Sequence, residues 1–236
     1  TDLALNYQDG GLKLLPYGSP DLRLTANILL MDSESVRFDQ FKLVEYLNSV
    51  YRNPESNLDE IVYALSGLAA LNEPVLLSLR GLIEEESLSL QEKMYIALAF
   101  DALGAKEDAQ KIFDEKYNEL VENTENNEGV ITTALSSVLA GSLGEIEKSE
   151  LLWEFVELIG LKSDDYSLNE DLINIYKIGR VAKTLPNVST KKVRFIMEKN
   201  GDTEDIELDN WESFGVLANA DDDLSVEVLK GEMDAI

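Results

Sequence analysis

The chain has 236 residues, of which 44% are hydrophobic and 28% are charged, so we expect a folded protein with one large domain, or one large and one small. Its 20 basic and 46 acidic residues give a net charge of −26, which repels phosphate backbones and anionic lipid surfaces. We therefore expect no binding to nucleic acid. An acidic surface that keeps the protein soluble is the simplest interpretation. A role in binding cations or a base-rich partner is the alternative.

Two residue types that carry much of enzyme chemistry are missing, because the chain has neither cysteine nor histidine. Their absence excludes disulfides, thiol nucleophiles, zinc sites of the usual ligand types and Ser-His-Asp arrangements. No run of 18 apolar residues occurs, so no membrane insertion is predicted. The polar opening Thr1-Asp2-Leu3 does not resemble a signal peptide, and we expect the chain to be an excerpt from a longer precursor.

Two glycine-containing turns open the chain, one at Asp9-Gly10-Gly11 and the other at Pro16-Tyr17-Gly18. Consecutive glycines permit a close approach of the backbone to a ligand or to a neighbouring segment. We take Asp9, Gly10, Gly11 and Tyr17 as the candidate binding residues, at one end of the helical region that follows. The alternative is that both segments are tight turns that lead into a helix and pack across its end.

From Leu22 to about Leu185 the apolar residues recur with the period of an α-helix. Within this region a short Ala-Leu-small pattern occurs three times, at Ala64, Ala97 and Ala134, with spacings of 33 and then 37 residues. Each copy is followed by a more charged helical stretch, so the repeating unit is a helix pair. Such a period is typical of stacked helical hairpins, and small residues at the repeated positions suit an inner layer of closely packed helices.

Helix-end signals support this division into helix pairs. Ser89 and Glu92 have the spacing of a capping box, and Asn57 or Asp59 can cap the helix that carries Ala64. Gly104 is expected to end the helix that carries Ala97. The predicted fold class is therefore mainly α, an α/α toroid of stacked helical hairpins over residues 1–186. Only about four pairs are readable, so either the ring is incomplete or its first helices lie in a preceding segment.

After Pro186 the pattern changes to that of short strands. Residues 193–197 are strand-like, Asn200-Gly201 is a strong hairpin turn, and alternating apolar residues follow up to about Leu208. Two more short strands are predicted, near residues 211–216 and 224–228. The chain is thus predicted to end in a small antiparallel β segment at residues 187–236, too small to form a sizeable core alone.

Two acidic clusters in this β segment invite a metal-binding interpretation. Asp221-Asp222-Asp223 lacks the spacing of the acidic motifs of terpene cyclases, so an exposed turn is the simpler account. Residues Asp202, Glu204, Asp205 and Glu207 do not fit the EF-hand pattern, because the turn glycine precedes the acids, although a weak calcium site in a hairpin loop stays possible. We expect neither a resident metal nor a cofactor.

Five segments, taken in order, resemble a known family. They are Gln8-Asp9-Gly10-Gly11-Leu12, Leu15-Pro16-Tyr17-Gly18, Leu24-Thr25-Ala26, residues 63–69 and residues 96–104. Their sequence is similar to that of the toroid in the thioester domain of bacterial alpha-2-macroglobulin-like proteins, in which an Asp-Gly-Gly segment and a turn lead into the helices. The resemblance covers residues 8–185. It implies an α/α toroid flanked by strands, in a secreted or cell-surface bacterial protein.

The resemblance does not bring the family's reactive chemistry with it. The family's Cys-Gly/Ala-Glu-Gln thioester lies upstream of the Asp-Gly-Gly segment, and this chain has no cysteine. We therefore expect a non-catalytic toroid module that works as a scaffold or as a protein-binding domain, in its sharpest form an inhibitor without a thioester. Its partner is expected to be another protein or the neighbouring domains of a larger chain. The alternative is an α/α-toroid enzyme that acts on a glycan or an isoprenoid.

Overall fold

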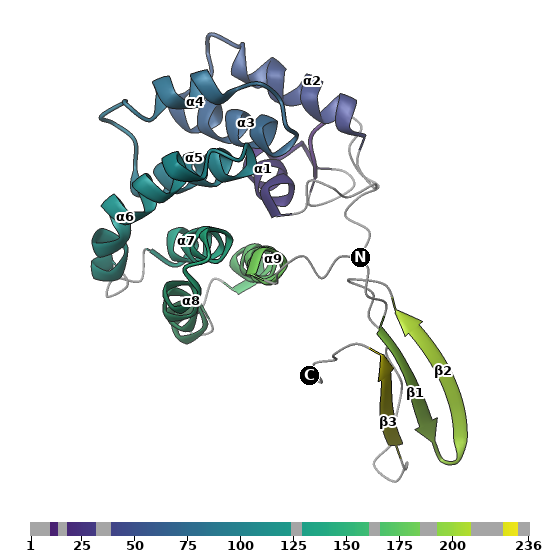
Figure 1. The fold of residues 1–236 in the computed structure, drawn as a ribbon. Helices are drawn as coiled ribbons and strands as arrows, with labels where there is room; N and C mark the ends of the chain where they lie inside the picture. Colours follow the sequence, from purple (N-terminus) through teal and green to yellow (C-terminus); the bar gives the residue numbers. More distant parts are fainter. Residues whose placement is uncertain are drawn as a thin grey trace. The chain divides into compact units, whose positions relative to one another are not determined.

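The computed structural model describes residues 10–13, 18–31, 39–123, 129–160, 166–184, 193–208 and 224–230. In these residues nine α-helices are followed by three β-strands (Figure 1). The structure confirms the coarse part of the predicted fold class: the protein is mainly helical, with a small antiparallel sheet near its end. The chain divides into two compact units, Thr1–Thr184 and Leu185–Ile236, which are described separately below.

The helices of the first unit alternate along the chain between a buried and a partly exposed environment. The helices are α1 Leu22–Met31, α2 Gln40–Tyr51, α3 Leu58–Ala70, α4 Leu76–Leu82, α5 Leu90–Ala102, α6 Lys106–Asn123, α7 Val130–Leu143, α8 Ile146–Gly160 and α9 Tyr166–Thr184. Along α3, α5 and α7 nearly every residue after the first turn is buried. In α2 and α6, by contrast, most residues keep part of their surface in solvent.

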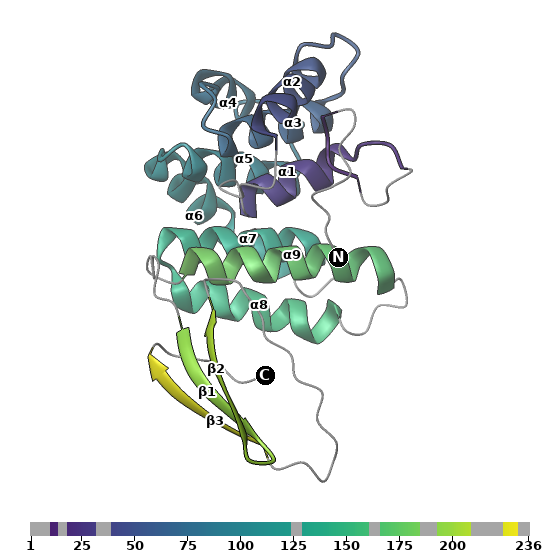
Figure 2. The ribbon, with the colours of Figure 1, turned by 90° about the vertical axis from the view of Figure 1, so that its right-hand side faces the viewer.

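Contacts between the helices place the odd-numbered ones inside. Helix α1 contacts α3, α3 contacts α5, α5 contacts α7, α7 contacts α9, and α9 contacts α1. We call these five the inner helices; their contacts close into a cycle. Helices α2, α4, α6 and α8 pack against them from outside and are called the outer helices. Figure 2 shows α7 and α9 side by side, with α8 against them.

Small residues let the inner helices approach one another closely. Ala64, Ala97 and Ala134, the three repeated positions, have no exposed surface. Where α9 returns to α1, Gly179 lies directly against the side chain of Met31, so that any β-carbon at position 179 would collide with it. A β-carbon on Gly141 of α7 would lie 2.5 Å from Cγ2 of Thr184 on α9. Because interiors are packed without spare room, these contacts require small side chains.

The predicted helix-end signals are present. The side chains of Ser89 and Glu92 form the expected capping box at the start of α5, and Asn57 forms a second one with Glu60 at the start of α3. Of the two candidate caps proposed for α3, the structure therefore uses Asn57. Gly104 follows the end of α5 with φ of +74°, a conformation that glycine adopts without strain.

The second unit contains a three-stranded sheet, with β1 Val193–Lys199, β2 Asp202–Leu208 and β3 Leu224–Lys230 in the order β2-β1-β3. Both pairings are antiparallel. The hairpin turn has positive φ at Asn200 (55°) and Gly201 (91°), as the sequence predicts. Phe195, Met197 and Ile206 form a small buried cluster on one face. The strand predicted near residues 211–216 and the acids at 221–223 lie outside the described residues.

Among the described helices, none is both long enough and apolar enough to cross a lipid bilayer. This agrees with the prediction that the chain does not insert into a membrane. The calcium interpretation of the β2 acids finds no support at Asp205, because Arg194 on β1 holds this carboxylate with two hydrogen bonds of 2.9 and 2.5 Å. This hydrogen bonding to Arg194 is the main cause that lowers the pKa of Asp205.

Candidate functional site

The space enclosed by the inner helices holds a buried layer of tyrosines. Tyr95 of α5 and Tyr176 of α9 have no exposed surface, and their hydroxyl oxygens lie 3.4 Å apart. The Tyr95 hydroxyl donates a 2.7 Å hydrogen bond to Oδ1 of Asn27 on α1. The ring of Tyr63 on α3 meets the Tyr95 ring edge-on, with 4.8 Å between the centroids. Four of the five inner helices therefore contribute to this layer.

The tyrosine hydroxyls of this layer are kept neutral by their surroundings. Burial raises the pKa of Tyr176 to about 12 and raises the pKa of Tyr95 well above its usual value. A low-dielectric interior disfavours the phenolate, because its charge has no solvent to stabilise it. These hydroxyls therefore act as hydrogen-bonding groups and not as bases near neutral pH. No signal in the sequence marked Tyr95 and Tyr176 as partners, because 81 residues separate them.

Tyr63 is only half-buried, and it links this layer to a surface cavity of about 630 Å³. The cavity lies between the segment that precedes α1, the first turns of α1 and α3, and α2; we call it the mouth cavity. It is lined by Ser19, Pro20, Asp21, Leu22, Arg23, Tyr46, Val50, Asn57, Asp59, Glu60 and Tyr63. The helix starts position these side chains, because the capping box of α3 fixes Asn57 and Glu60.

Two of the four sequence-predicted residues, Gly10 and Gly11, lie behind one wall of this cavity. Gly10 and Gly11 are buried, and neither lines the cavity. A β-carbon on Gly10 would lie 2.6 Å from the carbonyl oxygen of Lys42, and one on Gly11 would lie 2.6 Å from Cε1 of Tyr46. The two glycines thus allow the chain to lie against α2, behind the Tyr46 wall. Asp9 and Tyr17, the other two predicted residues, lie outside the described residues.

The mouth cavity is electrically negative. Asp21, Asp59 and Glu60 line it, against a single cation, Arg23, among the described lining residues. Burial raises the pKa of Tyr46, and the carboxylates of Asp21 and Glu60 raise it further. The pKa of a tyrosine rises beside negative charge because its phenolate would be repelled.

Asp59, which lines the mouth cavity, and Glu92 lie on the first turns of α3 and α5. Interaction with the side chain of Glu92 is the first cause that raises the pKa of Asp59, and burial adds to it. Burial raises the pKa of Glu92, but its interactions with Asp59 and Ser89 outweigh this effect and lower it overall. One carboxyl group thus holds its proton more tightly than usual, and the other is ionised more readily.

Glu92 is also bound by its own helix. Its Oε2 accepts hydrogen bonds from the backbone nitrogen of Ser89 (2.6 Å) and from the hydroxyl of Ser89 (2.5 Å). Its other oxygen, Oε1, is buried and finds no donor among the described residues. A signal for the Asp59–Glu92 pair existed in the sequence, since the two residues are 33 apart, the spacing of Ala64 and Ala97. They therefore occupy the same position in successive repeats.

The geometry of this pair does not fit glycoside hydrolysis. Paired carboxyl groups that cleave glycosidic bonds stand about 5–10 Å apart, so that the sugar or a water fits between them. Glu92 is buried and is committed to the capping of α5, where Ser89 holds its Oε2. Among the described residues no group of three or more His, Cys, Asp or Glu side chains could hold a metal ion.

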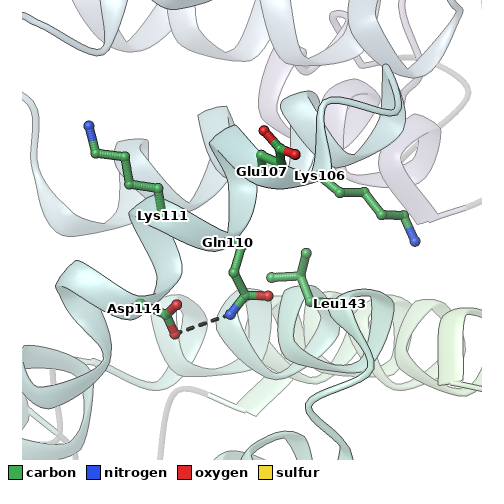
Figure 3. Close-up of a pocket in the computed structure, with 6 residues that line it drawn as sticks. All are labelled: Lys106, Glu107, Gln110, Lys111, Asp114 and Leu143. Atoms are coloured by element: carbon green, nitrogen blue, oxygen red, sulfur yellow. Dashed lines mark hydrogen bonds between the residues drawn. The ribbon is translucent and has the colours of Figure 1, made fainter.

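A second cavity, of about 490 Å³, lies between α6 and the end of α7 (Figure 3). It is lined by Lys106, Glu107, Gln110, Lys111, Asp114 and Leu143. Its polar groups bind one another or nearby residues: Gln110 donates to Asp114 at 3.1 Å, and Lys148 lies 3.6 Å from the same carboxylate. Because Asp114 and Lys111 are already paired, this cavity is the weaker candidate for a ligand site.

Away from both cavities, a cluster of polar side chains joins the C-terminal ends of the inner helices α5, α7 and α9. The carboxylate of Asp101, whose side chain is 4% exposed, accepts a 2.5 Å hydrogen bond from Ser142 and lies 3.3 Å from Nζ of Lys183. On the same face of α9, Arg180 donates to the hydroxyl of Ser149 at 3.0 Å and lies over the ring of Trp153. These contacts engage Oδ2 of Asp101, whereas its Oδ1 is buried without a partner among the described residues. The cluster links the ends of the three helices.

Comparison with protein-family models, with curated proteins and with solved structures finds no significant match to this chain. The site is therefore interpreted from its own residues.

Proposed function

We propose that this chain is a non-catalytic α/α-toroid module that works as a scaffold or as a protein-binding domain. The observation that carries the proposal is the burial of small and aromatic side chains inside the inner-helix cycle, which we call the filled interior. Ala64, Ala97 and Ala134 are fully buried there, together with Tyr95 and Tyr176. An enzyme with an axial active site needs a cavity in which a substrate loses its water, and these side chains occupy that space.

Exposed apolar side chains on the outer helices support a role in protein contacts. Leu77 of α4 is 80% exposed and Phe41 of α2 is 71% exposed. Leu151 and Leu158, seven residues apart on α8, are also exposed and lie on one side of that helix. Large apolar groups left in water are a common feature of surfaces that meet another domain or protein.

The resemblance to bacterial alpha-2-macroglobulin-like thioester domains supports the same proposal. It implies a module of a secreted or cell-surface bacterial protein, next to other domains of a larger chain. Without a cysteine, the module would act by contact alone and not by covalent trapping. The net charge of −26 favours a partner with a basic surface over nucleic acid.

The second candidate function is a toroid enzyme that acts on a glycan or an isoprenoid. The Asp59–Glu92 pair at the mouth cavity favours it, because pairs of carboxyl groups whose pKa values move apart are common in active sites. The burial of Glu92 and its capping role argue against it. The pKa shifts of the two groups follow from burial, hydrogen bonding and the charges of neighbouring residues.

The experiment that separates the two functions is a turnover assay. The purified chain is incubated with a panel of oligosaccharides and prenyl diphosphates, and products are detected by mass spectrometry. We expect no turnover. Product formation that disappears in Asp59→Asn but persists in Asp108→Asn, a matched change of an exposed acid on α6, would overturn the proposal.

A further inference from the structure

The outer surface of α8 carries a row of apolar side chains. Leu151 is 52% exposed, Leu158 is 62% exposed, and Phe155 between them is half-buried. Residues that follow one another at intervals of four and three lie on one side of a helix, so these three form a continuous row. Helix α8 packs against α7 and α9 with a different side (Figure 2), on which Leu152 and Val156 have no exposed surface. The row is therefore a second apolar surface of this helix, and much of it lies in solvent.

The spacing of this row is that of a helix that packs lengthwise against another helix. In such pairs the apolar residues recur at alternating intervals of three and four, and each fits between residues of the facing helix. The row supplies one interval of four, from Leu151 to Phe155, and one of three, from Phe155 to Leu158. A helix with apolar residues at the same intervals therefore matches this surface.

The exposed charges of α8 are all negative. They belong to Glu147, Glu150, Glu154 and Glu157. The one cation of the helix, Lys148, is partly buried and is already paired with two other carboxylates. Successive glutamates of this series stand three or four residues apart, a spacing at which like charges repel each other on a helix. Lysine or arginine beside the apolar row of a partner helix would replace this repulsion by attraction.

Helix α6, which is also an outer helix, has a different surface. Its charges are of both signs and pair along the helix, as Lys116 does with Glu119 at 2.9 Å and Lys111 with Glu115 at 4.0 Å. Val121, its one exposed large apolar residue in the part that the structure describes, is 38% exposed. Such a surface is stable in water by itself. The surface of α8 differs in both respects, so exposure to water alone does not explain its composition.

We propose that the row formed by Leu151, Phe155 and Leu158 docks a basic amphipathic helix of a protein partner. This inference rests on the proposed protein-binding function, and it names the surface that is used and the chemistry of the partner. The partner helix carries apolar residues at intervals of three and four, with lysine or arginine beside them. A second copy of this chain is a poor occupant, because contact between two α8 surfaces would bring the glutamates of both helices together.

The test uses the full chain and two synthetic peptides of identical composition, made of leucine, lysine and alanine and about 20 residues long, enough to form a helix. In the first peptide the leucines recur at intervals of three and four with lysines beside them. In the second the same residues are permuted, so that the leucines are spread around the helix. Fluorescence anisotropy of the labelled peptides measures both affinities at physiological ionic strength, where long-range attraction by the net charge is screened. We expect the first peptide to bind at least about tenfold more tightly than the second.

Paired apolar variants assign this binding to α8. Leu151→Gln combined with Leu158→Gln should lower the affinity for the first peptide at least about tenfold. Phe41→Gln combined with Leu77→Gln is the matched control, because it removes two apolar side chains on α2 and α4 that are even more exposed. The control should leave the affinity unchanged.

Paired charge variants test the acidic border of the row. Glu154→Lys places a cation beside Leu151 and Leu158 and should weaken the binding of the first peptide. Glu107→Lys makes the same change at an exposed position of α6 and should weaken it less. Both variants leave the apolar row intact, so they test the inference even if the double leucine variant does not fold.

Failure of the first peptide to bind, or equal affinities of the two peptides, would overturn the inference. Equal losses in the α8 variants and their controls would overturn it too, because binding would then follow the net charge alone. Dimerisation that the double leucine variant abolishes would assign the surface to a second copy. A large loss of stability in that variant without peptide would assign it to another segment of this chain. The proposed function fails separately, through turnover in the assay described above.

Discussion

The hydroxyl of Tyr95 donates a 2.7 Å hydrogen bond to Oδ1 of Asn27, a residue 68 positions earlier in the chain. This bond joins α5 to α1 across the interior of the inner helices, where neither side chain has any exposed surface. Nδ2 of Asn27 has no partner among the described residues, so Tyr95 supplies the one direct protein hydrogen bond that the structure gives this amide. The interior is thus held by a polar contact as well as by apolar packing.

Tyr95→Phe tests this contact. The substitution keeps the ring and leaves Oδ1 of Asn27 buried without its donor, which costs about 1–3 kcal/mol in the free energy of unfolding. Tyr51→Phe is the matched control, because the Tyr51 hydroxyl is only partly buried and bonds to Ser78 at 3.0 Å. Urea unfolding followed by circular dichroism measures both. Equal losses in the two variants would show that the interior hydrogen bond contributes no more to the free energy of unfolding than the partly buried one.

The two predicted glycines near the start of the chain are closely packed, unlike a glycine that only ends a helix. Gly10→Ala places a β-carbon 2.6 Å from the carbonyl oxygen of Lys42 at φ of +90°. Gly104→Ala meets a similar backbone cost at φ of +74° but has open space around it. We expect a loss of about 1–2 kcal/mol for Gly104→Ala, and a clearly larger loss for Gly10→Ala. Thermal unfolding of both variants is the measurement, and equal melting temperatures would contradict the close packing of Gly10.

The cluster at the C-terminal ends of α5, α7 and α9 offers a comparison of buried and exposed ion pairs. Lys183→Met removes the cation that faces Asp101, whose side chain is 4% exposed. A buried carboxylate that loses its partner destabilises a protein by about 3–5 kcal/mol, moderated here by the hydrogen bond from Ser142. Arg80→Met breaks the exposed pair with Asp108 and should cost at most about 1 kcal/mol. Similar values for both variants in denaturant unfolding would contradict this account.

Alkaline pH should weaken the fold through the buried tyrosines. The pKa of Tyr176 is raised to about 12 and that of Tyr95 is raised well above its usual value, whereas both titrate near 10 in the unfolded chain. A raised pKa in the folded state gives a contribution to stability that is complete below pH 10 and is lost as the pH rises from 10 towards 12. Unfolding measurements between pH 9 and 11.5 should show this decline, and Tyr176→Phe should reduce it.

Absorbance at 295 nm provides an independent reading of the same groups. The chain has nine tyrosines, and Tyr95 and Tyr176 should stay protonated at pH 11 for as long as the helices persist. Ionisation of all nine at pH 11, with the helical signal unchanged, would show that these two are not buried as described.

Much of the helical unit was predictable because its repeats and helix ends depend on residues at short, fixed spacings in the sequence. The repeated positions at Ala64, Ala97 and Ala134 identified the buried helices, since small residues at a fixed spacing are needed where helices pack on both sides. Likewise Ser89 and Glu92 showed where α5 begins, because a capping box depends only on residues three apart. The Asn200–Gly201 turn was predictable for the same reason.

The candidate site was less predictable because it is assembled across the chain. The sequence pointed to Gly10 and Gly11, which the structure places behind the wall of the mouth cavity and not on its surface. Asn27, Tyr95 and Tyr176 meet only because α9 returns to α1, and nothing local in the sequence encodes that return. For the Asp59–Glu92 pair the repeat spacing was sufficient information, because both residues occupy the same position in successive repeats.

The most direct test of the account is whether α9 closes the cycle by packing against α1. Met31→Cys removes the long side chain that a β-carbon at position 179 would meet. The two β-carbons would then lie 3.0 Å apart, so a shift of about 0.5 Å brings them into the range of about 3.5–4.5 Å that a disulfide spans. The chain has no native cysteine, so Met31→Cys combined with Gly179→Cys gives an unambiguous pair. A second pair, Gly104→Cys with Gly144→Cys, at positions with nothing within 4 Å, is the control.

Mild oxidation followed by non-reducing electrophoresis and mass spectrometry reports the result. The account predicts an intramolecular disulfide in the 31–179 pair and none in the control, together with a higher melting temperature of the oxidised form. Persistence of two free thiols at 31 and 179 in the folded chain would contradict the closed cycle of inner helices. The filled interior, on which the proposed scaffold function depends, would then be contradicted as well.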